Sequence, residues 1–287
     1  MNKVLVTGAA GLIGRALAHA LREAGHTVLE LNRADGDVAD AATWAPLPAV
    51  DHVFHLAGRS YVPDSWLDPA GFIQANVTGT MRALDYCHAT GARLVFASTS
   101  IFGAPARLPV REDDAVQPSN PYALSKFLAE RACAFYASHA NVAVTIARFV
   151  NIFGPGQRAE FLIPTIIDQV RRRDIIRLKA LSPRRDFLFL DDAVTALVRA
   201  MAPATGLRIV NIGSGVSHSV REVADIIQAA AGTNLAIASE ENERPNEIPD
   251  VRVDITRART LLGWTPRYSL SEGIARMLQM EDGALST

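Results

Sequence analysis

A phenol and an ammonium group stand four residues apart near the middle of the chain. Tyr122 and Lys126 follow Ser119-Asn120-Pro121, which is typical of a helix start because Ser or Asn can cap the first N–H groups and Pro lacks one. Residues four apart are neighbours on a helix surface. A phenol has a pKa of about 10, and a nearby cation favours its ionised form. The pair is suited to proton transfer, although an ordinary exposed helix pair has the same pattern.

The elements that would position this pair begin with a glycine turn. The apolar run 4–6 predicts a strand buried in a parallel sheet, and a helix is predicted up to about Ala24. Gly8, Gly11 and Gly14 lie between them in the spacing G-x-x-G-x-x-G. Glycines let a ligand approach the backbone, and a helix N-terminus favours negative charge, so this order predicts a dinucleotide phosphate site.

The end of the second predicted strand, Thr27 to Leu31, concerns the choice of cofactor. NAD-binding units commonly carry an acidic residue here for the ribose, whereas an arginine accommodates a 2′-phosphate. Asn32 and Arg33 follow this strand, which favours NADP(H) slightly over NAD(H). The alternative is that Glu30 or Asp35 supplies the acidic group from a shifted loop.

Two further strands are predicted to deliver polar side chains to the same sheet edge. Strand 51–56 leads into His55-Leu56-Ala57-Gly58, and strand 93–97 leads into Ser98-Thr99-Ser100. Ligands of open α/β sheets bind outside the carboxyl ends of the strands. The hydroxyl cluster could also be turn chemistry, and His55 has no partner at metal-ligand spacing, which favours a structural role. A long amphipathic helix containing Asn76 is predicted over 72–90.

The alternation of strands and helices predicts an α/β protein with a Rossmann-type, doubly wound parallel sheet. A smaller, discontinuous C-terminal lobe is expected to bind the substrate. We predict a dinucleotide-binding domain over 1–150, to which 186–212 returns, and a substrate lobe made mainly of 151–185 and 213–287.

The charge and cysteine content of the chain limit the kinds of ligand and partner that we expect. The net charge is −1, with 29 basic and 30 acidic residues, so no global field points to nucleic acid or to an anionic membrane. The two cysteines, Cys87 and Cys133, lack disulfide-framework and metal-ligand spacing, and we expect no metal. No signal peptide or membrane-spanning run is evident. We expect a cytoplasmic protein.

Together, these motifs resemble the extended short-chain dehydrogenase/reductase family, which contains nucleotide-sugar epimerases, dehydratases and ketoreductases. The matching segments occur in the same order across nearly the whole chain: Thr7–Gly14, Asp37-Val38, His55–Gly58, Asn76, Ser98–Gly103, Tyr122–Lys126, Asn151–Gly156, Arg185–Asp192, Asn211–Gly215 and Leu262-Gly263-Trp264.

The resemblance implies roles for individual residues. Catalytic roles fall on Ser98, Tyr122 and Lys126. Cofactor contacts fall on these two helix residues and on Gly8, Gly11, Leu12, Ile13, Gly14, Asn32, Arg33, Asp37, Val38, Leu56, Ala57, Gly58 and Asn76. Substrate contacts fall on Ser98, Thr99, Asn151, Arg185 and Arg244, whose guanidinium groups suit a nucleotide diphosphate.

The resemblance also implies a reaction. Hydride would pass between the nicotinamide and a carbon of a nucleotide-activated sugar while Tyr122 exchanges the hydroxyl proton. Ser98 would donate to the same oxygen, and Lys126 would hold the ribose and favour tyrosinate. A homodimer through the helices 72–90 and 122–139 is expected from the same resemblance.

Departures from the family pattern narrow the reaction. Dehydratases of the family carry an Asp-Glu pair where this chain has Thr99-Ser100. The absence of this Asp-Glu pair argues against a dehydratase and favours the reduction of a 4-keto-sugar nucleotide. The alternative is a C4 epimerase with tightly bound NAD. A non-catalytic NADP-binding sensor or assembly factor is a second alternative, against which the intact Ser98, Tyr122 and Lys126 argue.

Overall fold

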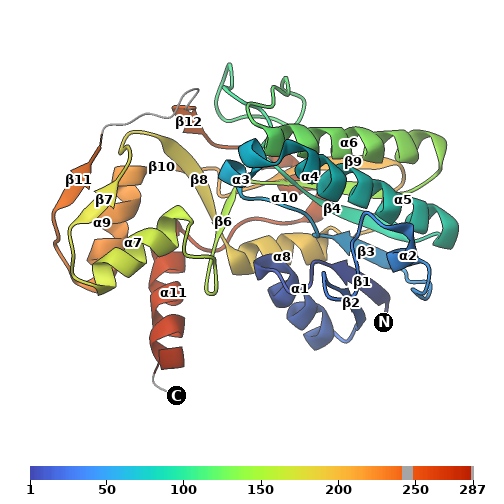
Figure 1. The fold of residues 1–287 in the computed structure, drawn as a ribbon, viewed down its shortest axis with the longest axis horizontal. Helices are drawn as coiled ribbons and strands as arrows, with labels where there is room; N and C mark the ends of the chain where they lie inside the picture. The colour runs from blue at the N-terminus through green and yellow to red at the C-terminus, as the bar shows by residue number, and fades with distance from the viewer. Residues whose placement is uncertain (241–247, 286–287) are drawn as a thin grey trace.

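A six-stranded parallel sheet forms the centre of the larger lobe (Figure 1). The structure is a computed structural model that describes residues 1–240 and 248–285. The order along the sheet is β2-β1-β3-β4-β5-β9, and every neighbouring pair runs parallel. These strands are β1 (Lys3–Thr7), β2 (Thr27–Leu31), β3 (His52–His55), β4 (Arg93–Thr99), β5 (Val144–Phe149) and β9 (Leu207–Ile212).

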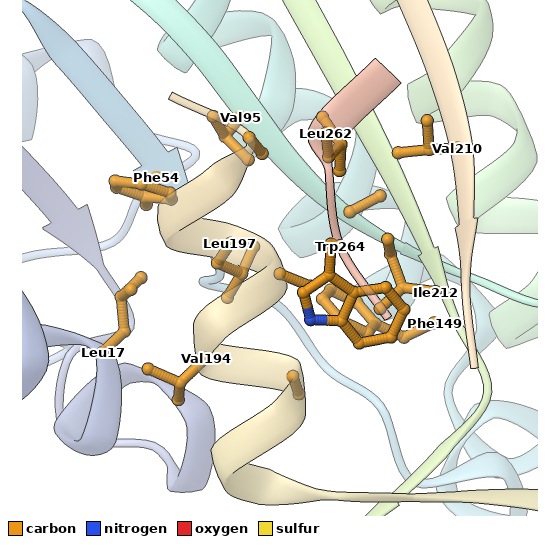
Figure 2. Packing of buried hydrophobic residues seen from close by; sticks show 14 of the residues in the cluster. Leu17, Phe54, Val95, Phe149, Val194, Leu197, Val210, Ile212, Leu262 and Trp264 are labelled. Carbon is orange, nitrogen blue, oxygen red and sulfur yellow. The ribbon is translucent and has the colours of Figure 1, made fainter. Parts of the chain in front are cut away.

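Helices cover both faces of this sheet, so the predicted doubly wound Rossmann-type fold is confirmed. On one face lie α1 (Leu12–Glu23) and α8 (Leu190–Arg199), and on the other lie α5 (Gly79–Thr90) and α6 (Pro121–His139). Figure 2 shows the core under α8, where the side chains of Val194 and Leu197 point toward the sheet among those of Leu17, Phe54, Val95, Val210 and Ile212. Both faces of the strands are therefore buried, as their continuous apolar runs require.

The chain changes direction across the sheet after β2. It adds β2 on one side of β1 and then crosses to place β3 on the other side. Ligands of open α/β sheets bind at such a switch point, outside the carboxyl ends of the two strands. Only the four-residue helix α2 (Ala41–Trp44) connects β2 to β3, because this segment is short and contains Pro46 and Pro48.

The helix predicted over 72–90 is interrupted. The chain forms α4 (Pro69–Ile73), a π-helical turn η1 (Gln74–Thr78) and then α5, preceded by the short helix α3 (Val62–Leu67), which the sequence analysis did not predict. Asn76 lies within the π-helical turn, and such turns are frequent at functional sites.

The smaller lobe is built on short strands. In it, β8 (Arg184–Phe189) pairs with β6 (Asn151–Phe153), β10 (Ser217–Ser219) and β12 (Asp250–Val251), while β7 (Ile176–Leu178) pairs with β11 (Ile237–Ser239). The helices α7 (Leu162–Arg171), α9 (Val220–Ala231) and α11 (Leu270–Leu285) enclose a separate apolar cluster against these strands.

Two segments place the lobe boundary differently from our sequence-based division. Residues 186–189 belong to β8 in the smaller sheet, although Leu188 packs in the core of the larger lobe, and α8 and β9 return to that lobe fully. The helix α10 (Thr256–Leu262) and Trp264 pack in the core of the larger lobe, although they lie in the C-terminal part of the chain (Figure 2). We therefore propose that α10 be counted with the dinucleotide-binding lobe.

Within the part of the chain that the structure describes, no helix has the length and apolar character needed to cross a membrane.

Candidate active site

The glycine turn lies at the switch point between β1 and β3. Gly8 has φ +69°, and a Cβ atom there would lie 2.9 Å from the backbone N and Cα of Ala57. A Cβ atom on Gly14 would lie 2.2 Å from the Gly8 carbonyl oxygen. Gly11 is the N-cap of α1, and no side chain caps that helix. The turn thus presents a tight backbone cradle and a helix N-terminus, which fit the pyrophosphate of a dinucleotide.

Of the cofactor residues predicted after β2, Asn32 and Asp37 form hydrogen bonds within the protein, whereas Arg33 is exposed. The side-chain oxygen of Asn32 accepts from Ala10 N at 2.6 Å, so Asn32 braces the glycine turn. Its backbone N–H donates to Asp35 (2.8 Å). Arg33 is exposed, and no described residue forms an ion pair with it. Asp37 accepts from Ala39 N at 2.9 Å.

His55 orders the loop after β3. It is fully buried, and its Nδ1 lies 2.9 Å from Thr7 Oγ1, which also accepts from Ala57 N at 3.1 Å. Burial, reinforced by the charge of Lys126, lowers the pKa of His55 to about 3. His55 is therefore neutral at physiological pH and supports the segment Leu56-Ala57-Gly58 at the site edge, in line with the structural role that the sequence favours.

Asn76 lies against the loop after β3, where a Cβ atom on Gly58 would lie 2.5 Å from its Oδ1, and its role toward the cofactor stays a prediction. The residue is 1% exposed. Its amide donates to Arg59 O (3.0 Å) and Ser125 Oγ (2.8 Å), and its oxygen accepts from Arg59 N (2.8 Å). Ser125 Oγ in turn donates to the Tyr122 carbonyl at 2.7 Å. Asn76 joins the loop after β3 to the first turn of α6, because the π-helical turn directs its side chain inward.

Tyr122 and Lys126 lie on the first turns of α6, as the sequence predicts. Asn120 is the N-cap, and its side chain accepts from Ala123 N at 2.8 Å. Lys126 Nζ lies 4.2 Å from the centre of the Phe96 ring. Burial lowers the pKa of Lys126 to about 8, with Cys133 and Glu130 acting in the opposite direction. Lys126 is thus mainly charged at neutral pH but poised close to its titration.

The structure separates the two hydroxyl groups at the end of β4. Burial raises the pKa of Tyr122, and a side-chain hydrogen bond with Thr99 offsets part of that rise. Ser98 instead donates to Glu130 Oε1 at 2.6 Å and is 5% exposed. The Ser98 hydroxyl is thus engaged by Glu130, eight residues after Tyr122 on α6, whereas Thr99, the last residue of β4, reaches the phenol. The resemblance assigned the catalytic hydroxyl to Ser98, but the geometry gives the position beside Tyr122 to Thr99.

A buried charge pair that the sequence analysis did not identify lies beneath this site. Arg148 of β5 donates to both carboxylate oxygens of Glu130, with Nη2 2.7 Å from Oε2 and Nε 3.0 Å from Oε1. The side chains are 5% and 4% exposed. Signals existed in the sequence, because Glu130 is four residues after Lys126 on the same helix face and Arg148 interrupts an apolar strand.

The substrate-side residues meet around β8. Asn151 donates to Asp186 O at 3.2 Å, and Arg185 Nη1 donates to the carbonyls of Arg184 and Ile248 at 2.7 and 2.6 Å. Arg244 lies outside the described residues. The predicted substrate roles of Asn151 and Arg185 stay predictions, and their positions at the junction of the two lobes are consistent with them.

Asp186 is a second buried carboxylate that the sequence analysis did not identify. It is fully buried and accepts from Ser214 N (2.9 Å), Ser214 Oγ (2.6 Å) and Gly215 N (3.0 Å). Burial raises its pKa to about 6, and these hydrogen bonds act in the opposite direction. Asp186 therefore fixes the loop after β9 against β8. Among residues 1–240 and 248–285, no group of three or more His, Cys, Asp and Glu side chains could hold a metal ion.

Comparison with known proteins shows the family of this chain. Residues 4–213 match the NAD dependent epimerase/dehydratase family. The chain belongs to this family. Among family relatives, a UDP-glucose 4-epimerase from Mycolicibacterium smegmatis is 33% identical over 310 residues, covering 96% of this chain and 97% of the relative. A GDP-6-deoxy-D-mannose reductase from Pseudomonas aeruginosa is 31% identical over 295 residues, covering 96% of each chain.

A solved structure shows the same fold. The structure of RMD from Pseudomonas aeruginosa complexed with NADPH is similar with a TM-score of 0.90 and 27% identity, covering 99% of this chain and all of the other. The extended short-chain dehydrogenase/reductase assignment is confirmed, and its relatives are NAD(P)-dependent enzymes of nucleotide sugars. These relatives include both epimerases and reductases, so membership alone does not choose between the two reactions.

Proposed function

We propose that this protein is an NAD(P)-dependent oxidoreductase that reduces a 4-keto-sugar nucleotide. One observation carries the proposal: a Tyr122-Lys126 pair with a hydroxyl partner lies at the carboxyl ends of strands that also hold a glycine cradle. Ser100 and Ile101 follow Thr99 and neither is acidic, so the site is equipped for redox proton transfer and not for the elimination of water.

The residues of the chain have distinct parts in this reaction. Bound NAD(P)H would supply the hydride. Tyr122, whose pKa is raised, holds its proton at neutral pH and donates it to the oxygen that becomes the hydroxyl. Thr99 donates a hydrogen bond near the same oxygen, and the ammonium of Lys126 stabilises the resulting phenolate. Ser98 does not contact the reacting oxygen in this scheme and donates its hydrogen bond to Glu130.

NADP(H) is the cofactor that we propose. Arg33 is exposed after β2 without an ion pair in the described residues, so its guanidinium is available to a 2′-phosphate. Asn32 offers no carboxylate to oppose that phosphate, since its side chain binds the glycine turn. The NADPH complex of RMD supports this choice by analogy.

A C4 epimerase is the second candidate, and the 33% identical UDP-glucose 4-epimerase favours it. The same Tyr122 would then remove a hydroxyl proton first and return it after the intermediate has rotated. Such an enzyme retains its cofactor between turnovers, whereas a reductase exchanges it.

An experiment that detects whether the cofactor is exchanged distinguishes the reductase from the epimerase. Purified protein is assayed with NADPH or NADH against a panel of 4-keto-sugar nucleotides, and separately against nucleotide sugars without added cofactor. We expect oxidation of NADPH, and Tyr122→Phe should lower kcat by about 10³-fold or more while cofactor affinity changes little. Interconversion of two 4-epimers with stoichiometric bound NAD would replace the reductase with the epimerase, and binding without turnover would favour a sensor.

A further inference from the structure

A buried polar network lies directly behind the candidate active site. Ser98 of β4 donates to Glu130 of α6, and Glu130 is paired in bidentate fashion with Arg148 of β5. Arg148 Nη1 also donates to Glu112 O at 3.0 Å, and its guanidinium lies 5.1 Å from the centre of the Phe102 ring. All three side chains are about 95% buried. The network therefore connects three elements that converge on the site.

We propose that Glu130, with Ser98 and Arg148, positions the hydroxyl of Thr99 and the ammonium of Lys126 around Tyr122. The inference rests on the proposed redox function for its kinetic test, while its second test needs no turnover.

Ser98 and Thr99 are consecutive residues at the end of β4, so the position of one constrains the other. Both residues meet α6, Ser98 at Glu130 and Thr99 at the phenol of Tyr122, eight residues earlier on the helix. Because the bond from Ser98 to Glu130 fixes the end of β4 against α6, it also holds the neighbouring Thr99 beside Tyr122. Arg148 occupies the position paired with Ser98 in the parallel register of β4 and β5. Loss of the Ser98 bond would free the strand end to rotate away from the phenol.

Glu130 also acts on the charge of Lys126. Glu130 lies one helical turn after it, in surroundings where burial opposes the ammonium form. The groups that face Lys126 from the neighbouring elements are the neutral imidazole of His55 on β3, the ring of Phe96 on β4 and, on α6 itself, Cys133 and Glu130. Cys133 and Glu130 both act to raise the pKa of Lys126, but burial raises the pKa of the Cys133 thiol so that it stays protonated at neutral pH, which leaves the carboxylate of Glu130 to favour the ammonium.

A buried ion pair is costly to desolvate, and an apolar pair of similar volume would often be as stable. Glu130 and Arg148 are therefore poorly explained by stability alone. A role in holding the site geometry accounts for charged groups at this depth, since their hydrogen bonds are directional and apolar contacts are not.

The kinetic test is a double-mutant cycle of Ser98→Ala and Thr99→Val. If Ser98 acts through Thr99, Thr99→Val should lower kcat by about 10²-fold and Ser98→Ala by about tenfold, whereas Ser98→Ala should change little in the Thr99→Val background. Additive effects would overturn the positioning role. A large loss in Ser98→Ala together with a small loss in Thr99→Val would show that Ser98 is itself the catalytic hydroxyl.

The second test measures Lys126 directly. The chain has three lysines, Lys3, Lys126 and Lys179, so protein carrying isotope-labelled lysine gives a resolvable set of side-chain NMR signals, assigned with Lys126→Met. We expect Glu130→Gln to lower the pKa of Lys126 by about one unit. The control is Glu112→Gln, which removes an equally buried carboxylate that faces Asn211 N and should leave the titration unchanged.

The Lys126 titration can be read whether or not the protein is a reductase, so its result is separate from a failure of the proposed function. An unchanged Lys126 titration in folded Glu130→Gln overturns the electrostatic role, whichever reaction the enzyme catalyses. If Glu130→Gln does not fold, Glu130→Asp keeps the charge and shortens the side chain, and it should preserve the Lys126 titration while lowering kcat as Ser98→Ala does. If wild-type protein is an epimerase, the same cycle is measured on epimerisation.

Discussion

At the scale of single residues, the chemistry depends on how burial and neighbouring charges set the pKa values of Tyr122 and Lys126. Burial raises the pKa of the Tyr122 phenol above its usual value of about 10 and lowers the pKa of the Lys126 ammonium to about 8, so the two pKa values move apart and Lys126 loses its proton at a lower pH than Tyr122. A proton donor that stays protonated beside a cation that is still charged suits the reductive direction at neutral pH. Thr99 forms a hydrogen bond with Tyr122, and Ser98 donates to Glu130 beside them.

The pH dependence of turnover tests the state of Lys126. Because its pKa is about 8, the ammonium is present below that pH and is lost as the pH rises through it. We expect kcat/KM for the cofactor, which reports the free enzyme, to fall on the alkaline side with an apparent pKa near 8.

Lys126→Met is the control for this profile. It should be less active and should lack the alkaline limb. Tyr122 is an unsuitable source for the limb, because its pKa is raised above the usual value of a phenol. A limb that persists in Lys126→Met would show that another group titrates.

At the scale of elements, strand ends and loops are held by buried carboxylates. Glu130 fixes the end of β4, and Asp186 at the centre of β8 fixes the loop that follows β9. Both carboxylates are satisfied by several hydrogen bonds, as buried charges must be. The elements that carry the site are thus joined across the boundary between the two lobes.

Asp186 gives a stability prediction with a definite sign. Its pKa is raised to about 6 in the folded protein, so between about pH 4 and pH 6 the folded state keeps a proton that the unfolded chain releases. This contribution to the free energy of unfolding is present at the acidic end and is lost as the pH rises through 6, by about 3 kcal/mol in total. Asp186→Asn should remove that slope.

Urea unfolding of wild type and Asp186→Asn at about pH 4 and about pH 7 checks the prediction. Asp225→Asn, which changes an exposed carboxylate on α9, is the matched control and should keep the wild-type slope. Equal slopes in wild type and Asp186→Asn would contradict the assignment.

At the scale of the whole molecule, an apolar stripe remains uncovered on α6. Leu124, Leu128 and Phe135 share one face of that helix and are 44%, 38% and 59% exposed, and Met81 on the neighbouring α5 is 43% exposed. Contiguous exposed apolar side chains often mark an interface between subunits. These helices are the ones through which a homodimer is proposed, and the stripe supports that proposal.

Leu128→Glu combined with Phe135→Glu should convert a dimer to a monomer. Each change removes about 1.5 to 3 kcal/mol of apolar burial per protomer, so the two changes on both protomers remove at least about 6 kcal/mol and the dissociation constant should rise by about 10⁴-fold or more. Light scattering at micromolar concentration measures the mass. Leu261→Glu, on α10 and 50% exposed, is the control and should leave the mass unchanged. Wild-type protein that is already monomeric would contradict the dimer.

The sequence by itself was sufficient for the features that depend on local spacing. A glycine turn between a buried strand and a helix predicts the phosphate cradle, since both signals lie within a few residues. The Tyr122-Lys126 pair shares a helix face because of its four-residue spacing. The class of the fold and the family follow from the order of such local motifs along the chain.

Only the tertiary structure decided which side chains meet across elements. The register of β4 against β5 and the packing of α6 direct Ser98 to Glu130 and leave Thr99 beside Tyr122. Asn76 turns inward at a π-helical turn that has no sequence signal of its own. Asp186 and Arg148 are charged residues within strands, and their partners lie 28 and 18 residues away in the sequence. Spacing along a chain predicts neighbours on one element, whereas contacts between elements depend on how the elements pack.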